Sequence, residues 1–332
     1  MKGQNISLRQ ARYHLSIYLF LLPCALFIGM FAYYPAVNGI YHSFFQWNGG
    51  DVDRFHGAQS YSKLFLADTE FWLAFKNALI LGIANIFKMA PSIVTAVCLH
   101  RVRNARLQFV YRVAFVVPMV IPILVTTYLW KAIYDPSNGA LNTILQSTGL
   151  MKALVWISSS AAHLSENFDP LGFFSWLGAL FRAGENPAWL GTPSLAMLAL
   201  ILRDFPWVGT FGVLVYLAVL QSIPRDIYEA AEVDGAGWLS KFRYIELPMI
   251  LRQVRIMMIL VIMGSINDAG LVMAMFGIEG GPGGVVQVPA LFMYREAFQN
   301  QNLGYACAIG VVMFAVILIC TKLNDWLVKP GD

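Results

Sequence analysis

The sequence predicts an all-α membrane protein that crosses the bilayer about six times, with both termini in the cytoplasm. Two observations support this fold class: an apolar composition and the placement of the positive charges. Hydrophobic residues make up 58% of the 332 residues, and charged residues make up only 13%. Soluble proteins carry roughly 25% charged residues, so this chain has too few polar side chains to cover a water-soluble globule. We therefore expect lipid to surround much of it.

Six apolar segments are long enough, or nearly long enough, to cross a bilayer, which takes about 20 residues of helix. The expected spans are residues 15–34, 78–99, 113–130, 195–221, 256–278 and 304–321. Their apolar runs are continuous rather than alternating, which favours helices over a barrel. The basic segment before the first run could pass for a signal peptide, but that run is longer than a typical signal, so we expect a retained span.

The Lys and Arg residues indicate which loops face the cytoplasm. Of the 23 Lys and Arg residues, 14 lie in residues 1–14, 100–112, 222–255 and 322–332, whereas 7 lie in the longer segments 35–77, 131–194 and 279–303. The first set should be cytoplasmic, and an even number of spans agrees, because it places both termini on one side. We expect a cytoplasmic N-terminus (1–14), a transmembrane domain (15–328) and a short cytoplasmic tail (329–332).

Neither a metal site nor a disulfide framework is indicated. The four cysteines, Cys24, Cys98, Cys307 and Cys320, lie in or beside apolar runs and form no CxxC or Cys/His cluster. We expect them to be small buried apolar side chains.

The cytoplasmic loop 222–255 contains a clear helix signal. Ser222 can cap a helix, Pro224 suits its first turn, and Gly235 can take the left-handed conformation that ends it. A second short helix is expected from Trp238 to just before Pro248, which should break the chain ahead of the fifth span.

The first of these helices differs from its basic surroundings. It carries four acidic residues and a pair of small ones: Asp226, Glu229, Glu232 and Asp234, with Ala230 and Ala231. A short acidic helix with a small face suits a groove with basic walls on a cytoplasmic partner. A capped surface helix with solvated charges is the other interpretation of the same residues.

The spacing in this loop resembles a known motif. Glu229-Ala230-Ala231, three residues, Gly235, nine residues and then Ile245-x-Leu247-Pro248 is similar to the EAA motif of binding-protein-dependent ABC importer permeases. The segments LLPCALFIGMFAYYPAVNGIYHSFFQW, VPMVIPILVTTYLWKAIYDPSNGALNTIL, AVLQSIPRDIYEAAEVDGA and GGPGGVVQVPALFMYREAFQNQNLGYACAIG also resemble this family, in its carbohydrate-uptake branch. That branch contains the maltose and glycerol-3-phosphate permeases.

The resemblance implies a type I ABC importer permease fold, in a bacterial or archaeal cytoplasmic (inner) membrane. It implies that the EAA loop docks into a separate ATPase through Glu229, Ala230, Ala231, Asp234, Gly235, Ile245, Leu247 and Pro248. The other implied partners are a second related permease in a heterodimer, a second ATPase subunit, an extracytoplasmic solute-binding protein and membrane lipid, but no nucleic acid.

No cofactor and no enzyme activity are expected in this chain itself. It lacks the GxxxxGK[ST] motif that cradles nucleotide phosphates, so ATP and Mg should bind the partner ATPase. A membrane-embedded enzyme has no support, because the sequence shows no HExxH, nucleophile elbow or paired-carboxylate site.

Several polar residues lie within the expected spans, where ionisable side chains are costly and often functional. They are Lys88, Arg203, Asp204, Trp207, Asn267 and Asp268. One interpretation is a polar solute pathway near the midplane, and the other is structural pairing of Lys88 with Asp204 or Asp268. A stand-alone secondary transporter or channel that uses these three residues as an ion relay is the alternative function. The solute class stays open among sugars, oligosaccharides, glycerol phosphate and glycan-derived or lipid-linked compounds.

The outside loop 135–192 looks roughly 35 residues longer than is usual in this family. It contains several turn signals and one short apolar helix, expected at residues 171–181. We expect it to contact the solute-binding protein or the membrane surface.

Overall fold

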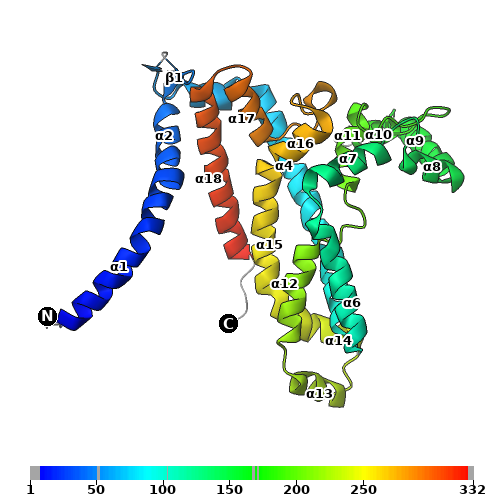
Figure 1. Ribbon diagram of the computed structural model, residues 1–332. Coiled ribbons are helices and arrows are strands. Elements are labelled where there is room, and N and C mark those ends of the chain that lie inside the picture. Colours follow the sequence, from blue (N-terminus) through cyan, green and yellow to red (C-terminus); the bar gives the residue numbers. More distant parts are fainter. Residues whose placement is uncertain (1–7, 51–52, 103, 167–168, 170–171, 328–332) are drawn as a thin grey trace. The chain divides into compact units, whose positions relative to one another are not determined.

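The computed structural model describes residues 8–50, 53–102, 104–166, 169 and 172–327. The expected tail at 329–332 and the first seven residues of the expected N-terminal segment lie outside the described residues. The chain divides into two compact units, one of residues 1–67 with 296–312 and one of residues 68–295 with 313–332. Figure 1 shows the elements along the chain.

The helices of the chain are α1 (Leu8–Ile28), α2 (Tyr34–His42), α3 (Gln59–Leu66), α4 (Thr69–Phe87), α5 (Met89–His100), α6 (Ala105–Val116), α7 (Ile123–Ile133), α8 (Ala140–Ser147), α9 (Leu150–Ser165), α10 (Phe173–Gly178), α11 (Pro193–Leu202), α12 (Thr210–Gln221), α13 (Arg225–Val233), α14 (Trp238–Lys241), α15 (Leu247–Asn267), α16 (Ala269–Phe276), α17 (Pro289–Phe298) and α18 (Leu303–Leu327). The two strands are β1 (Phe45–Trp47) and β2 (Asp53–Phe55), which pair antiparallel.

The first unit contains the first apolar helix and a small hairpin. Residues 17–42 form a continuous apolar helix, longer than the expected span 15–34, because a π turn at Gly29–Tyr33 joins α1 to α2 without a break. In the hairpin Phe45 lies opposite Phe55. A β-carbon on Gly304, at the start of α18, would lie 2.1 Å from the Phe45 carbonyl oxygen, so only glycine permits this contact.

The second unit contains the other apolar helices, except for the first part of α18, residues 303–312, which belongs to the first unit. Helices α4 and α5 continue one another across Lys88 to form a 32-residue apolar rod, Thr69–His100. Helix α12 packs against α5 and α15, and α15 packs against α4. One core cluster joins these helices through Val97 of α5, Val213 and Leu217 of α12, and Ile250 of α15.

Among the described residues, four helices are long and apolar enough to cross a membrane, or five if the bent pair α6–α7 counts as one span. That pair bends by 89° next to Pro118 and Pro122. The expected fourth span, 195–221, is not continuous. It consists of α11 and α12, of 10 and 12 residues, because Pro206 donates no backbone hydrogen bond and Asp204 and Trp207 take positive φ angles.

The prediction that Pro248 breaks the chain was wrong. Residues 238–267 form one continuous 30-residue helix. A π turn, Phe242–Glu246, directly precedes Leu247 and Pro248, and in it the Leu247 N–H donates to the Phe242 carbonyl. Pro248 lies in the first turn of α15, and the wider π turn accommodates its ring and missing donor. The expected fifth span, 256–278, instead breaks at Asp268, whose carboxylate accepts from the Leu271 N–H at 3.2 Å.

The loop 135–192, which we expect on the outside, is more regular than predicted, because it contains three helices, α8, α9 and α10. Their apolar faces reach one core with α11, in which Leu145, Leu180 and Trp189 are buried. Helices α9 and α10 approach closely: a β-carbon on Gly178 would lie 2.9 Å from the Ala162 α-carbon.

The expected burial of the cysteines holds only in part. Cys307 and Cys320 are half-buried, whereas Cys24 and Cys98 are exposed. Cys24 and Cys98 lie on helix faces that the rest of this chain does not cover. An apolar stretch of sequence does not reveal whether a given face of its helix is buried or exposed.

Candidate functional site

The loop after α12 carries a short helix, α13, at Arg225–Val233. The expected cap was wrong: the Ser222 hydroxyl donates instead to the Val219 carbonyl at 2.7 Å. Helix α13 begins only after Pro224, which takes an extended conformation at the N-cap position. Asp226 lies in the first turn, where its negative charge interacts favourably with the positive end of the helix dipole.

The other end of α13 is closed by a Schellman motif. The Ala236 N–H donates to the Ala231 carbonyl at 2.8 Å, and the Gly235 N–H donates to the Glu232 carbonyl at 3.0 Å. These two bonds satisfy carbonyls that a helix end leaves free. Gly235 has a φ of 71°, in the left-handed region that glycine adopts without steric cost. Gly235 therefore ends the helix as the sequence predicted.

The face of α13 that carries the motif is open. Glu229 and Ala230 are exposed and Ala231 is half-buried. Glu229 makes no ion pair with another described residue, whereas Glu232 pairs with Lys241 at 2.7 Å. Figure 1 shows α13 beyond the end of α12, reached only through loops. This combination of free carboxylates, small residues and access is suited to contact with another protein.

Ile245, Leu247 and Pro248 have a different environment from α13. Ile245 and Leu247 pack against the core cluster that joins α5, α12 and α15. Pro248 is exposed at the start of α15. These residues therefore attach the loop to the helical body rather than extend its open face.

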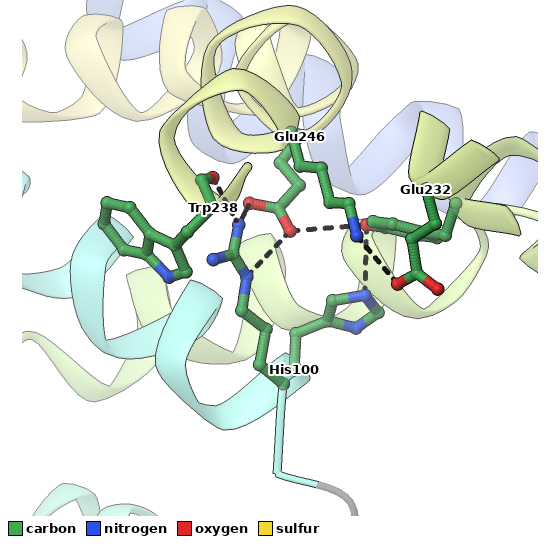
Figure 2. A network of polar contacts seen from close by, with 7 residues as sticks. His100, Glu232, Trp238 and Glu246 are labelled. Carbon is green, nitrogen blue, oxygen red and sulfur yellow. Dashed lines mark hydrogen bonds and ion pairs between the residues drawn. The ribbon is translucent and has the colours of Figure 1, made fainter. Parts of the chain in front are cut away.

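A partly buried polar network adjoins α13 (Figure 2). The side chain of Glu246 is fully buried, and its two oxygens accept from the Arg101 guanidinium, Oε1 from Nε at 3.1 Å and Oε2 from Nη2 at 2.7 Å. The Tyr228 hydroxyl lies 3.5 Å from Glu246 Oε1 and 3.1 Å from His100 Nε2. Arg101 also donates to the Trp238 carbonyl at 3.3 Å. The network thus joins the end of α5 to α13 and α14.

Burial and the neighbouring Glu246 carboxylate raise the pKa of Tyr228 to about 12. Its phenol therefore stays neutral at physiological pH and keeps a proton to donate. Sequence reasoning missed this whole network, because Glu246 is the unspecified position of Ile245-x-Leu247. The available signal was an acidic residue between two apolar ones near the start of a span.

The second candidate site is a cavity of about 380 Å³ between the helices of the second unit. Four of the six predicted pathway residues line it: Lys88, Arg203, Asp204 and Asp268. Residues that sequence reasoning did not single out add further polar groups, namely Asn85, Ser92 and Ser265. Lys88 lies where α4 continues into α5, and Asp268 lies at the break between α15 and α16.

The charged residues of the cavity are only partly paired. Arg203 binds Asp204 at 2.8 Å, while its own Nε is buried without a partner among the described residues. Within the described part of the chain, the Lys88 side chain makes neither an ion pair nor a hydrogen bond, so it is not paired with Asp204 or Asp268 in this structure. The negative charge of the nearby Asp204 carboxylate attracts the positive charge of Lys88.

The structure does not bring Trp207 and Asn267 into the cavity lining. The Trp207 indole donates to the Ile201 carbonyl at 3.1 Å, and its own carbonyl accepts from Ser92 at 3.4 Å. Asn267 is exposed at the end of α15.

Residues 71–329 match the protein family described as binding-protein-dependent transport system inner membrane component. The chain belongs to this family. It is therefore a multi-pass permease of the inner membrane, and the family predicted from the EAA spacing is confirmed.

Several relatives of this permease align over nearly its whole length. It is 29% identical over 317 residues to the probable ABC transporter permease protein YurN of Bacillus subtilis, covering 95% of this chain and 96% of YurN. It is 28% identical over 313 residues to the diacetylchitobiose uptake system permease protein NgcF of Streptomyces coelicolor, covering 91% of this chain and 78% of NgcF.

A solved structure has the same fold as this permease. A chain of a bacterial alginate ABC transporter, solved in complex with an alginate pentasaccharide-bound periplasmic protein, superimposes with a TM-score of 0.73. The match covers 98% of this chain and 99% of that chain, at 21% sequence identity. The expected type I importer permease fold is thereby confirmed.

Proposed function

We propose that this permease carries a sugar or a related polar solute across the inner membrane, delivered by a solute-binding protein and driven by separate ATPase subunits. The observation that carries the proposal is α13: a capped, acidic, small-faced helix that projects from the apolar helices and matches the EAA spacing. Relatives named for diacetylchitobiose and for multiple sugars support the solute class.

Coupling to ATP would proceed through the open face of α13. Glu229 would meet a basic group in a cleft of the ATPase, and Ala230 and Ala231 would permit close approach. Asp234 and Gly235 would keep the end of the helix compact inside that cleft. ATP and Mg would bind the partner, since this chain carries no GxxxxGK[ST] motif, so it would not hydrolyse ATP itself.

The solute would pass by the cavity around Lys88, Arg203, Asp204 and Asp268. Hydroxyl-rich solutes need convergent donors and acceptors, and these side chains with Asn85 and Ser92 supply both. Trp207 would act indirectly, because its carbonyl accepts from the Ser92 hydroxyl. Asn267 would contact solute only in another state of the transporter. Alternating access would open the cavity first to one side and then to the other.

The assembly would contain a second, related permease, two ATPase subunits and one solute-binding protein. A heterodimer of permeases fits the resemblance to the maltose type. Membership of the binding-protein-dependent family favours this importer over a stand-alone transporter or channel based on Lys88, Asp204 and Asp268.

The test is uptake by the reconstituted transporter. The permease is co-expressed with a candidate second permease and a candidate ATPase from the same genome, and uptake of solute bound to a candidate binding protein is measured in proteoliposomes. We expect uptake only with ATP and with all subunits present. Equal uptake by the purified chain alone, without ATPase, would overturn the proposal and favour the secondary transporter.

A further inference from the structure

We propose that Glu246 is a positioning residue that makes α13 and α5 move as one body. We call its ion pair to Arg101 the joint, because it would connect the two helices rigidly. This inference rests on the proposed function, because it concerns how movement of a docked ATPase reaches the solute cavity. It assigns a role to a buried network outside the defining positions of the EAA motif.

The joint is built to persist during movement. Glu246 is 0% exposed, and both of its oxygens are bound by one guanidinium, in the paired geometry that makes arginine–carboxylate contacts strong and directional. Separating the two would leave a buried carboxylate without its positively charged partner, which is far more costly than losing a surface ion pair. Forces on either side should therefore move the elements together rather than open this contact.

Three elements meet at this ion pair. Arg101 directly follows α5, Glu246 ends the π turn before α15, and Tyr228 of α13 lies against both His100 and Glu246. The Arg101 guanidinium also stacks over the Trp238 ring, with its carbon 4.8 Å from the ring centroid. Helix α13, which is otherwise reached only through loops, is thereby held to the end of α5.

Helix α5 then leads directly to the cavity. It begins beside Lys88, and both Lys88 and Ser92 line the cavity. Its 12 residues span about 18 Å at the helical rise of about 1.5 Å per residue. A displacement of α13 that is carried by the joint would therefore reach the cavity wall through a single rigid helix.

The control for this joint is an exposed ion pair outside the α13 loop. Glu279 binds Arg295 at 3.2 Å, and its side chain is 67% exposed. A surface pair of this kind contributes little to stability. Glu246→Gln and Glu279→Gln each remove one carboxylate charge that is paired with an arginine, so their comparison separates loss of the buried joint from loss of an ion pair in general.

The experiment uses the full reconstituted transporter with Glu246→Gln, Arg101→Gln, the double variant and Glu279→Gln. The readouts are the amount of ATPase subunit that co-purifies and the solute taken up per ATP hydrolysed. We expect the ATPase to co-purify with every variant, while uptake per ATP falls at least tenfold in Glu246→Gln and stays within twofold of the wild type in Glu279→Gln. If Glu246→Gln does not accumulate, the double variant, which removes both charges of the pair, and Tyr228→Phe carry the same comparison.

A distance measurement separates transmission from simple stability. Spin labels are attached to Cys98, which is exposed on α5, and to Arg225→Cys, with the other three cysteines replaced by alanine. We expect the distance between the labels to be the same in the resting and ATP-bound transporter, and to differ between these two states in the Glu246→Gln variant. An unchanged distance and normal uptake per ATP in Glu246→Gln would overturn the joint alone. Failure of the wild-type chain to recruit any ATPase would instead overturn the proposed function.

Discussion

Arg101 and Glu246, 145 residues apart in the sequence, form a two-bond ion pair at the point where the α13 loop meets the helical body. The carboxylate is completely buried, and the guanidinium is partly covered. The α13 loop is therefore fixed at its base and open at its tip. We expect substitutions at its base to disturb folding and substitutions at its tip to disturb only the proposed coupling.

Gly235→Ala should impair coupling through the backbone alone. A β-carbon there would meet no atom within 4 Å, but the φ of 71° is a conformation that costs other residues about 1–2 kcal/mol. The end of α13 should shift, and uptake per ATP should fall several-fold. Gly237→Ala is the control, because Gly237 is equally open but has a φ of −72°. Equal effects of the two changes would contradict the role of the left-handed turn.

Glu229→Lys should weaken docking of the ATPase without loss of the folded permease. Glu229 is exposed and makes no ion pair within the described residues, so reversing its charge should alter stability by less than about 0.5 kcal/mol. Co-purification of the ATPase is the measurement. Glu185→Lys, an equally exposed change in the outside loop, should have no effect. Full recruitment by Glu229→Lys would argue against α13 as the docking helix.

Tyr228→Phe should weaken the attachment of α13 and lower the free energy of unfolding by about 1 kcal/mol, the usual contribution of one hydrogen bond. The wild type should also respond to alkaline pH. The folded-state pKa of Tyr228, about 12, lies above its ordinary value of 10.0, so its stabilisation is complete below about pH 10 and is lost as pH rises toward about 12. Thermal midpoints should therefore fall more steeply above about pH 10 in the wild type than in Tyr228→Phe. Parallel curves would show that Tyr228 does not carry this titration.

Lys88→Met should abolish uptake while leaving assembly and ATP hydrolysis intact, if Lys88 contacts solute. Lys88 has no ion pair to lose within the described residues, so the folded chain should accumulate normally. If uptake follows solute binding, a loss of more than tenfold corresponds to at least about 1.4 kcal/mol of binding free energy. Lys76→Met, an exposed change on α4 outside the cavity, is the control. Reduced accumulation of Lys88→Met would favour a structural role instead.

The outside helices should contribute to uptake through their exposed aromatic residues. Trp156 of α9 is 69% exposed and Phe173 of α10 is 51% exposed, so replacing both by serine should spare the core of this loop. We expect uptake to fall while the ATPase still co-purifies. Ser159→Ala, on the exposed side of α9, should change neither. Normal uptake by the double variant would show that the exposed aromatic residues of this loop do not contribute to transport.

The sequence alone determined the class of this protein. Its low charge and long apolar runs identify a membrane protein, because those features do not depend on how the helices pack. The EAA spacing is equally local: Gly235 ends α13 through bonds within six residues, so its role was readable from the order of residues.

The predictions that failed depended on contacts or backbone breaks that local patterns do not specify. Pro248 does not end a helix, because a π turn before it accommodates the ring. The apolar run 195–221 is two helices, separated where Asp204 and Trp207 take positive φ angles. Hydropathy averages over such breaks and therefore reports a single span.

Only the tertiary structure decided which polar residues share a site. It brought Lys88, Arg203, Asp204 and Asp268 to one cavity and left Trp207 and Asn267 outside its lining. It also paired Arg101 with Glu246, which nothing in either local sequence indicates. Residues this far apart along the chain meet only when the helices pack. Packing also excludes water from a charged side chain such as Glu246, and only then does that charge need a partner within the protein.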